Sequence, residues 1–244
     1  MERCDYVNDS LKLIQNTSGL TFGTDALLLA GYIGMRGKKG CELGAGSGII
    51  SMLLLTRGKL SEIDAVEVQP EYAELSARNA ELNGLTEKMR VIAADIREFG
   101  ETGAYDTVFT NPPYMKTDTG KANLNDKKNI ARHEVFGSIY DFCAAAKRLL
   151  KFGGSFYAVY RPDRTADLID AMRKHGLEPK RMTLVYADTE SEPSMLLIEG
   201  RMGGGCGMKM TAPFIIYKDG SHTELSDNMN YVYENGVFPT PFLR

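Results

Sequence analysis

The sequence predicts an α/β fold in which helices cover both faces of a mostly parallel sheet. From Lys39 onward, short apolar runs alternate with longer amphipathic segments, a pattern typical of parallel strands joined by helices. A glycine-rich run, Gly44 to Gly48, lies between the first of these strands and the first of these helices. The last two strand-like segments have no helix between them, so they must pair antiparallel.

Length and composition indicate one large domain with two small appendages. The chain has 244 residues, of which 43% are hydrophobic and 25% charged, as in an ordinary globular protein. We expect a single domain over residues 1–244, with an N-terminal arm at 1–21 and a C-terminal extension at 203–244 packed on it. Because the formal net charge is −3, a polyanionic partner must bind at a local basic patch.

Cysteine usage and hydropathy predict the compartment. The four cysteines show no paired spacing and no adjacent histidine cluster, so we expect no metal site and no disulfide framework; they are Cys4, Cys41, Cys143 and Cys206. The amino terminus carries charges instead of an apolar signal sequence, and no apolar run approaches the roughly 20 residues that span a bilayer. These features predict a cytoplasmic protein, monomeric or homodimeric, with no membrane partner.

The elements follow from periodicity and from the residues that cap or end helices. Residues 6–19 indicate a short hairpin or an irregular arm, and Thr24 or Asp25 can cap a helix that runs to about Gly34. Pro70 begins a helix that Asn83 and Gly84 end. The strands are expected at 39–43, 63–68, 90–94, 105–110, 155–160, 181–186 and 194–199, and the further helices at 49–56, 139–150 and 162–175. Residues 203–207 predict a loop, 214–217 a strand-like stretch, and 224–244 a short helix with an irregular end.

The glycine-rich turn predicts a site where a ligand approaches the main chain. Its glycines, Gly44, Gly46 and Gly48, occupy alternate positions between a strand and a helix, which allows a sharp turn and a close ligand. The dinucleotide-binding fingerprint requires its third glycine at position 49, which is occupied by Ile49. An acidic residue, Glu42, lies two positions before the first glycine.

Two further acidic residues follow successive strands. Glu67 ends the strand at 63–68 and can accept both hydroxyls of a ribose, and Asp95 follows the next strand. The simpler interpretation of Glu67 is a solvent-facing charge, and that of Asp95 is a helix cap. All of these positions lie at the carboxyl ends of parallel strands, where open α/β sheets bind ligands, and that coincidence favours a binding site.

The run Asn111-Pro112-Pro113-Tyr114 directly follows the strand at 105–110. Two prolines remove two donors, so the Pro112 carbonyl and the Asn111 side-chain oxygen can together accept both hydrogens of a planar amino group. Tyr114 supplies a flat face for the ring that carries the amine. A strand-ending turn in which Asn111 caps a loop and Tyr114 is a core residue is the alternative.

These motifs resemble those of the bacterial tRNA1(Val) adenine-37 N6-methyltransferases. The resemblance is carried by Asn111-Pro112-Pro113-Tyr114, by the acidic and glycine-rich turn, by Phe22-Gly23-Thr24-Asp25, and by Arg132-His133-Glu134, and it spans most of the chain. It implies a Rossmann-like class I methyltransferase with a seven-stranded sheet whose last strand is antiparallel. It also implies S-adenosylmethionine as the cofactor, S-adenosylhomocysteine as the product, and the N6 amine of an adenine in RNA as the acceptor, with tRNA expected and the anticodon loop as the target.

The resemblance assigns roles residue by residue. Asn111, Pro112 and Tyr114 would be catalytic, and Glu42 would suit the cationic amino group of the methionine moiety. Glu67 would bind the ribose, while Asp95 and Ile96 would contact the adenine. The cofactor set is completed by Thr24, Asp25, Gly44, Gly46, Gly48, Val68 and Asn111. Substrate contacts would come from Pro113, Tyr114, Lys116, Lys121, Lys127, Lys128 and Arg132, in a basic loop that could close on phosphates or simply be a solvated charge run.

Other acceptors and classes remain open at this level. The same four residues serve guanine-N2 rRNA methyltransferases and protein glutamine-N5 methyltransferases, although the latter carry a helical domain ahead of the glycine turn, and only about twenty residues precede Phe22 here. A cofactor- or RNA-binding module without catalysis is the non-enzyme alternative. A nicotinamide oxidoreductase is a more distant one.

Overall fold

The computed structural model describes residues 2–8, 10–16, 22–34, 37–112 and 137–243. The strands in this part of the chain are β1 Glu2–Asn8, β2 Leu11–Asn16, β3 Lys39–Leu43, β4 Glu62–Glu67, β5 Met89–Ala93, β6 Tyr105–Thr110, β7 Leu150–Tyr160, β8 Leu177–Tyr186, β9 Pro193–Met202, β10 Lys209–Met210 and β11 Phe214–Ile215. The helices are α1 Thr24–Tyr32, α2 Ile49–Thr56, α3 Pro70–Leu82, α5 Ile139–Leu149, α6 Thr165–Lys174 and α7 Asp227–Asn235, with the 3-10 turns η1 Pro162–Arg164 and η2 Thr240–Phe242.

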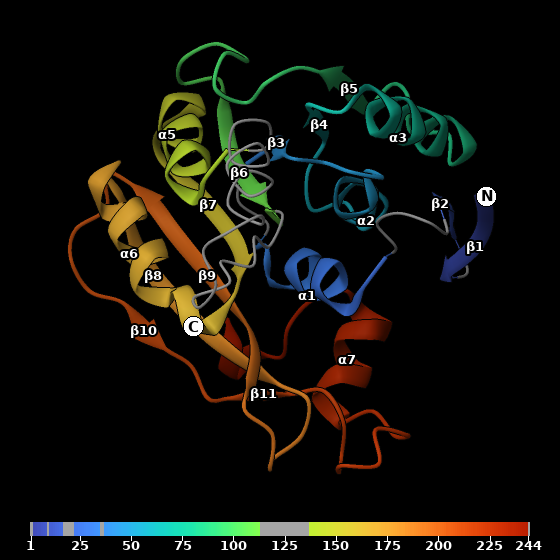
Figure 1. The fold of residues 1–244 in the computed structure, drawn as a ribbon, viewed down its shortest axis with the longest axis vertical. Helices are drawn as coiled ribbons and strands as arrows, with labels where there is room; N and C mark the ends of the chain where they lie inside the picture. The colour runs from blue at the N-terminus through green and yellow to red at the C-terminus, as the bar shows by residue number, and fades with distance from the viewer. Residues whose placement is uncertain (1, 9, 17–21, 35–36, 113–136, 244) are drawn as a thin grey trace, which may run out of the picture.

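The central sheet has the predicted α/β topology (Figure 1). Its strand order is β10-β8-β9-β7-β6-β3-β4-β5, and β11 also pairs with β8. β3, β4, β5, β6 and β7 pair in parallel, whereas β9 lies antiparallel to both β7 and β8. The predicted seven-stranded arrangement with an antiparallel last strand is therefore confirmed, and β10 and β11 extend its edge.

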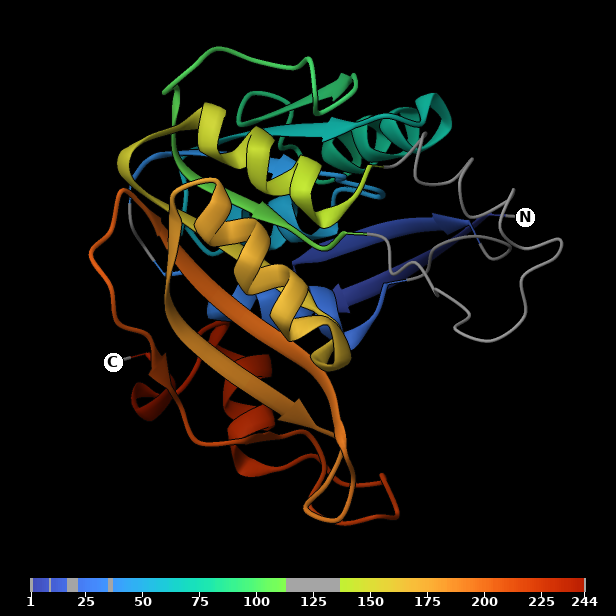
Figure 2. The same cartoon turned by 60° about the vertical axis from the view of Figure 1, so that its left-hand side comes forward.

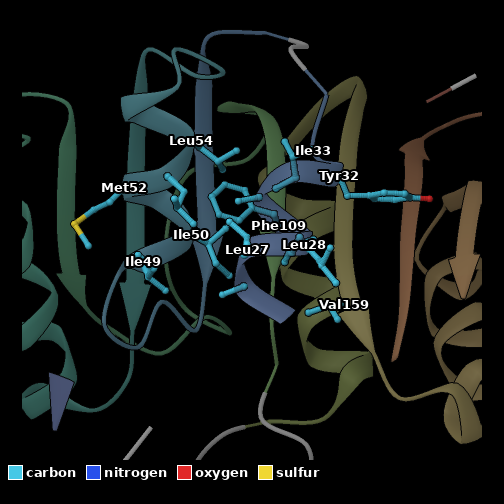
Figure 3. Close-up of a cluster of buried hydrophobic side chains, with 14 of the residues drawn as sticks. Leu27, Leu28, Tyr32, Ile33, Ile49, Ile50, Met52, Leu54, Phe109 and Val159 are labelled. Carbon is cyan, nitrogen blue, oxygen red and sulfur yellow. The ribbon is translucent and has the colours of Figure 1, made fainter. Parts of the chain in front are cut away.

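Helices cover both faces of this sheet. α5 and α6 lie side by side on one face, and α1, α2 and α7 lie on the other, as Figures 1 and 2 both show. Figure 3 shows the apolar cluster on the second face, in which Leu27 of α1 and Ile50 of α2 gather with Phe109 of β6 and Val159 of β7. Because each fully buried side chain of this size contributes roughly 1.5–3 kcal/mol, the cluster fixes α1 and α2 firmly on the sheet.

The N-terminal arm is a β-hairpin in the structure. β1 and β2 pair antiparallel, from Glu2 opposite Asn16 to Asn8 opposite Leu11. The hairpin lies beside α3 in Figure 1. Of the two shapes expected for this segment, the structure shows the hairpin and not the irregular arm.

The C-terminal extension is tied to α1 by a buried arginine. Arg181 of β8 donates to the Phe242 carbonyl at 2.6 Å and to the Tyr32 carbonyl at 3.0 Å, and it pairs with Glu199 at 2.9 Å. Its guanidinium also lies 3.9 Å from the centre of the Tyr32 ring. The aromatic ring of Phe238 packs edge-on against Tyr32. The last helix and turn are therefore anchored on the end of α1.

Several local predictions are wrong. The strands expected at 181–186 and 194–199 are longer, Leu177–Tyr186 and Pro193–Met202. α1 is capped by Gly23 rather than by Thr24 or Asp25, which are its first two residues; the Asp25 carboxylate instead accepts a hydrogen bond from the Asn111 amide. The strand predicted at 155–160 begins at Leu150, directly after α5. Tyr105 of β6 pairs with Leu150 and Thr107 pairs with Ser155, so residues 151–154, which were expected to separate the helix from the strand, are a bulge within β7.

Candidate active site

Hydrogen bonds join the carboxyl end of β3 to the carboxyl ends of its two neighbours in the sheet, β4 and β6. The backbone N–H groups of Gly44 and Ala45 both donate to the Val66 carbonyl, at 2.9 Å each. The buried hydroxyl of Thr110, at the end of β6, donates to the Leu43 carbonyl at 2.8 Å. The structure therefore places the glycine turn beside both the Glu67 strand and the Asn111 strand, as the sequence predicts for one shared site.

The glycine turn requires glycine for two different reasons. Gly44, Gly46 and Gly48 have φ values of +73°, +54° and +79°, a region that other residues rarely adopt. A Cβ on Gly48 would lie 2.4 Å from the Ser76 hydroxyl and 2.6 Å from the Met89 terminal methyl, so the turn packs tightly against α3 and β5 there. A Cβ on Gly46 would meet nothing within 4 Å, so the backbone at Gly46 is open to a ligand.

The Glu67 carboxylate connects the end of β4 to the glycine turn. It accepts from the Gly46 backbone N at 2.8 Å and from the Gln69 backbone N at 3.0 Å. Each oxygen has one further lone pair, so the group can still accept from a ligand hydroxyl. Val68, which follows Glu67, is half-buried.

Glu42 is buried beneath the turn. Its carboxyl accepts from the Ser51 backbone N at 3.1 Å and from the Ser51 hydroxyl, and 1% of the residue is exposed. Burial raises the pKa of Glu42 to about 8; the hydrogen bonds from Ser51 lower it and the negative charge of Glu67 adds to the rise. Glu42 therefore lies against the first turn of α2, and its predicted contact with a cationic amine stays a prediction.

Asp95 and Ile96 follow β5 at the same sheet edge. The Asp95 carboxylate accepts from the Arg97 backbone N at 2.9 Å and forms an ion pair with the Arg97 guanidinium, whose hydrogen bonds lower the pKa of Asp95. Ile96 is 6% exposed and belongs to the apolar cluster under α5. Both residues lie at the predicted end of the strand, but both Asp95 carboxylate oxygens accept from the Arg97 guanidinium, and the predicted contacts with an adenine stay predictions.

Asn111 contacts a residue that is distant in sequence. Its side-chain Nδ2 donates to Asp25 Oδ2 at 2.8 Å, which joins the end of β6 to the start of α1. Thr24, Asp25 and Asn111 are all half-buried, and Pro112 is buried. The structure thus brings the Phe22-Gly23-Thr24-Asp25 segment together with Asn111, which sequence spacing alone does not predict.

Two buried amides that sequence reasoning missed hold these segments together. Asn79 of α3 accepts from Ile14 N at 2.7 Å and donates to Ile14 O and to Ser47 O, at 3.1 Å each. Gln15 of β2 accepts from the Phe22 backbone N at 2.5 Å. The sequence offered one signal for this contact, which is the position of Asn79 on the buried face of an amphipathic helix. A buried amide needs hydrogen-bond partners, so such an asparagine must contact other polar groups.

Several predicted site residues lie outside the described part of the chain. They are Pro113, Tyr114, Lys116, Lys121, Lys127, Lys128 and Arg132. Their assigned roles stay predictions. Among the described residues, no cluster of three or more histidine, cysteine or acidic side chains could hold a metal ion, and no helix has the length and apolarity that a membrane crossing requires.

A profile of known families matches residues 17–175, under the description "Methyltransferase small domain". The chain belongs to the methyltransferase small-domain family. The match covers the glycine turn, both acidic strand ends and Asn111, which the structure brings to one edge of the sheet.

Relatives within the methyltransferases agree with this family. The chain is 25% identical over 185 residues to the tRNA1(Val) (adenine(37)-N6)-methyltransferase of Dyadobacter fermentans, covering 75% of this chain and 76% of that protein. It is 28% identical over 177 residues to the protein of the same name from Phocaeicola vulgatus, covering 72% and 74%.

Solved methyltransferase structures share the fold. A predicted O-methyltransferase from Agrobacterium tumefaciens superposes with a TM-score of 0.71 at 22% identity, covering 88% of this chain and 98% of that one. TYW2 of P. horikoshii, solved with MeSAdo, gives a TM-score of 0.59 at 13% identity, covering 83% and 72%. These likenesses confirm the class I methyltransferase fold of the chain.

Proposed function

We propose that this chain transfers a methyl group from S-adenosylmethionine to the N6 amine of an adenine in tRNA, at position 37 of tRNA1(Val). The observation that carries the proposal is the Asn111 amide at the end of β6, held by Asp25 beside the glycine turn. Family membership supports methyl transfer, and the relatives' names support the adenine of this tRNA.

The described residues fit the proposed cofactor. Gly46 leaves open space where a ligand can approach the main chain, and Glu67 keeps free lone pairs beside it for a ribose diol. Asp95 would accept from the adenine amino group if Arg97 shares its carboxylate, with Ile96 against the ring. When bound, S-adenosylmethionine would supply an electrophilic methyl group on a sulfonium.

The chemistry of the acceptor follows from the Asn111 motif. An adenine amine is a weak nucleophile because its lone pair is delocalised into the ring. If Asn111 Oδ1 and the Pro112 carbonyl accept its two hydrogens, the nitrogen is positioned and its lone pair becomes more available for attack. Positioning and exclusion of water then supply most of the acceleration, and the proton leaves the amine after or during transfer. No side chain need act as a strong base.

The tRNA substrate is supported by the relatives and by the sequence after Asn111. Five basic residues lie between 115 and 134 in the sequence, directly after the amine-binding motif. They suit a phosphate backbone, and an exposed anticodon-loop base needs no separate flipping domain. We therefore propose that the protein acts in the cytoplasm.

The experiment is methyl transfer from labelled S-adenosylmethionine to purified tRNA and rRNA, followed by mass spectrometry of the nucleosides. We expect N6-methyladenosine in tRNA1(Val) only. Label in guanosine of rRNA would instead support the guanine-N2 alternative, and label in protein glutamine the glutamine-N5 alternative. Absence of transfer despite cofactor binding would contradict the proposal and leave a binding module.

A further inference from the structure

We infer that Asp25 is a positioning residue that orients the Asn111 amide for the acceptor amine, rather than a residue that binds the cofactor. The inference rests on the proposed function, because it assigns Asp25 a role in the same methyl transfer. It departs from the expectation that Thr24 and Asp25 contact the cofactor.

The contact defines which end of the amide faces which partner. Asp25 Oδ2 lies 2.8 Å from Asn111 Nδ2, and Asp25 Oδ1 accepts from the Ala26 backbone N at 2.9 Å. An ionised carboxylate only accepts hydrogen bonds, so the amide nitrogen must face Asp25. The opposite orientation would place an amide oxygen against a carboxylate oxygen, which is repulsive. Asp25 therefore leaves Asn111 Oδ1, the acceptor atom, for the substrate.

This assignment matters because an unrestrained asparagine can present either end. If the amide turned over, Asn111 would present its N–H groups to the adenine amine. Both groups would then be hydrogen-bond donors with no acceptor between them. The acceptor would then be repelled at the reacting nitrogen. A single hydrogen bond to a charged acceptor suffices to favour one orientation strongly.

Asp25 is itself held in place from both sides. It is the second residue of α1, whose later residues Leu27 and Leu28 are buried against the sheet. The chain just before it is fixed by the hydrogen bond from Phe22 N to Gln15 of the hairpin. Gly23 leaves room for the carboxylate, because a Cβ on Gly23 would lie 2.6 Å from Asp25 Oδ1. The glycine is thus required by space, since its φ of −120° suits any residue.

Three variants test this role. Asp25→Leu replaces the carboxylate with a side chain of similar size that cannot accept a hydrogen bond. Asp25→Asn keeps a side-chain oxygen that can accept from Asn111. Gly23→Ala leaves the carboxylate intact but displaces it. The matched control is Gly34→Ala, because a Cβ there meets only the Tyr157 hydroxyl at an ordinary 3.5 Å.

The readouts are turnover at saturating S-adenosylmethionine, cofactor Kd by calorimetry, and the thermal unfolding midpoint. We expect Asp25→Leu to lower kcat about 100-fold, a factor typical of losing one preorganised polar contact, with cofactor Kd changed less than about 3-fold. Asp25→Asn should retain more turnover than Asp25→Leu, Gly23→Ala should lose turnover, and Gly34→Ala should match the wild type. A raised cofactor Kd with unchanged kcat in Asp25→Leu would overturn the inference and restore the cofactor role.

A double-mutant cycle separates this inference from the proposed function. Asp25→Leu and Asn111→Ala, alone and combined, should shift the unfolding midpoint non-additively, because each removes the same hydrogen bond. Strict additivity would overturn the inference whether or not the protein methylates tRNA. If the wild type transfers no methyl group but the cycle is non-additive, the proposed function fails while the Asp25–Asn111 coupling stands.

Discussion

The side chain of Asn79 donates to the Ser47 carbonyl at 3.1 Å and exchanges two hydrogen bonds with the backbone of Ile14. One fully buried amide on α3 therefore joins the N-terminal hairpin to the glycine turn. The neighbouring Asn83 makes the same kind of paired contact with Lys12 of the hairpin, but its other hydrogen bonds go to Met52 and to the backbone of Asn79 rather than to the turn.

Asn79→Ala should both destabilise the protein and weaken cofactor binding. It leaves partly buried backbone groups of Ile14 and Ser47 without their Asn79 partner, which costs about 2–3 kcal/mol of unfolding free energy. We expect the S-adenosylmethionine Kd to rise about 10-fold, as measured by calorimetry, because the turn loses its support. Asn83→Ala is the control, with a smaller loss of stability and a Kd within about 3-fold of the wild type. Equal effects of both variants on Kd would show that the turn does not depend on Asn79.

Gly48→Ala should be far more destabilising than Gly58→Ala. Both residues have positive φ, +79° and +64°, so both substitutions cost about 1 kcal/mol of backbone strain. Only Gly48 is also crowded, by Ser76 and Met89, whereas a Cβ on Gly58 meets nothing within 4 Å. We expect about 3 kcal/mol or more for Gly48→Ala by urea unfolding. Similar midpoints for the two variants would mean that α3 and β5 move aside easily.

Glu42→Gln should change how stability depends on pH. The folded protein keeps the Glu42 proton up to a pKa of about 8, whereas the unfolded chain releases it near the ordinary value of 4.5. Raising the pH from 5 to 8 therefore favours the unfolded chain, so this residue's contribution to stability is complete below pH 4.5 and is lost as pH rises towards 8.

Because glutamine does not titrate, the stability of Glu42→Gln relative to wild type should increase over that interval. A tenfold difference in proton affinity between the folded and unfolded chains corresponds to about 1.4 kcal/mol, so a change of a few kcal/mol is expected. The measurement is urea unfolding of both proteins at several pH values. Parallel stability curves from pH 5 to 8 would refute a raised pKa at Glu42.

Glu67→Ala should weaken cofactor binding more than it weakens folding. The variant removes the carboxylate that holds the Gly46 and Gln69 amides and that is proposed to bind the ribose. We expect the S-adenosylmethionine Kd to rise about 100-fold while kcat at saturating cofactor changes little. Glu62→Ala, an exposed residue at the other end of β4, is the control. A normal Kd in Glu67→Ala would remove Glu67 from the cofactor site.

Much of the fold follows from local sequence signals. The bounds of β3, α2 and β6 match the expected residues because each segment lies next to a local stop signal, such as Gly44 after β3, Gly48 before α2 or Asn111-Pro112 after β6. The start of β7 does not, because Gly153 and Gly154 suggest a turn where the strand instead forms a bulge against β6. Pairing between strands decided that boundary, and pairing is not a local property.

The site was predictable where residue type and position coincide with strand ends. Glu67, Asp95 and Asn111 were predicted in this way, and the structure places all three at the carboxyl edge of the sheet, while their roles stay predictions. The Asp25–Asn111 bond joins residues 86 positions apart, so it depends on how α1 packs on the sheet. The links through Asn79 and Gln15 were missed for the same reason, since their partners are backbone groups that carry no sequence signature.

The most direct test of the account compares wild type and Asn111→Ala in transfer of methyl groups to tRNA1(Val), with cofactor Kd measured on the same samples. We predict N6-methyladenosine at position 37 with the wild type, a loss of at least about 1,000-fold in kcat with Asn111→Ala, and an unchanged cofactor Kd. Normal methylation of the tRNA by Asn111→Ala would contradict this prediction.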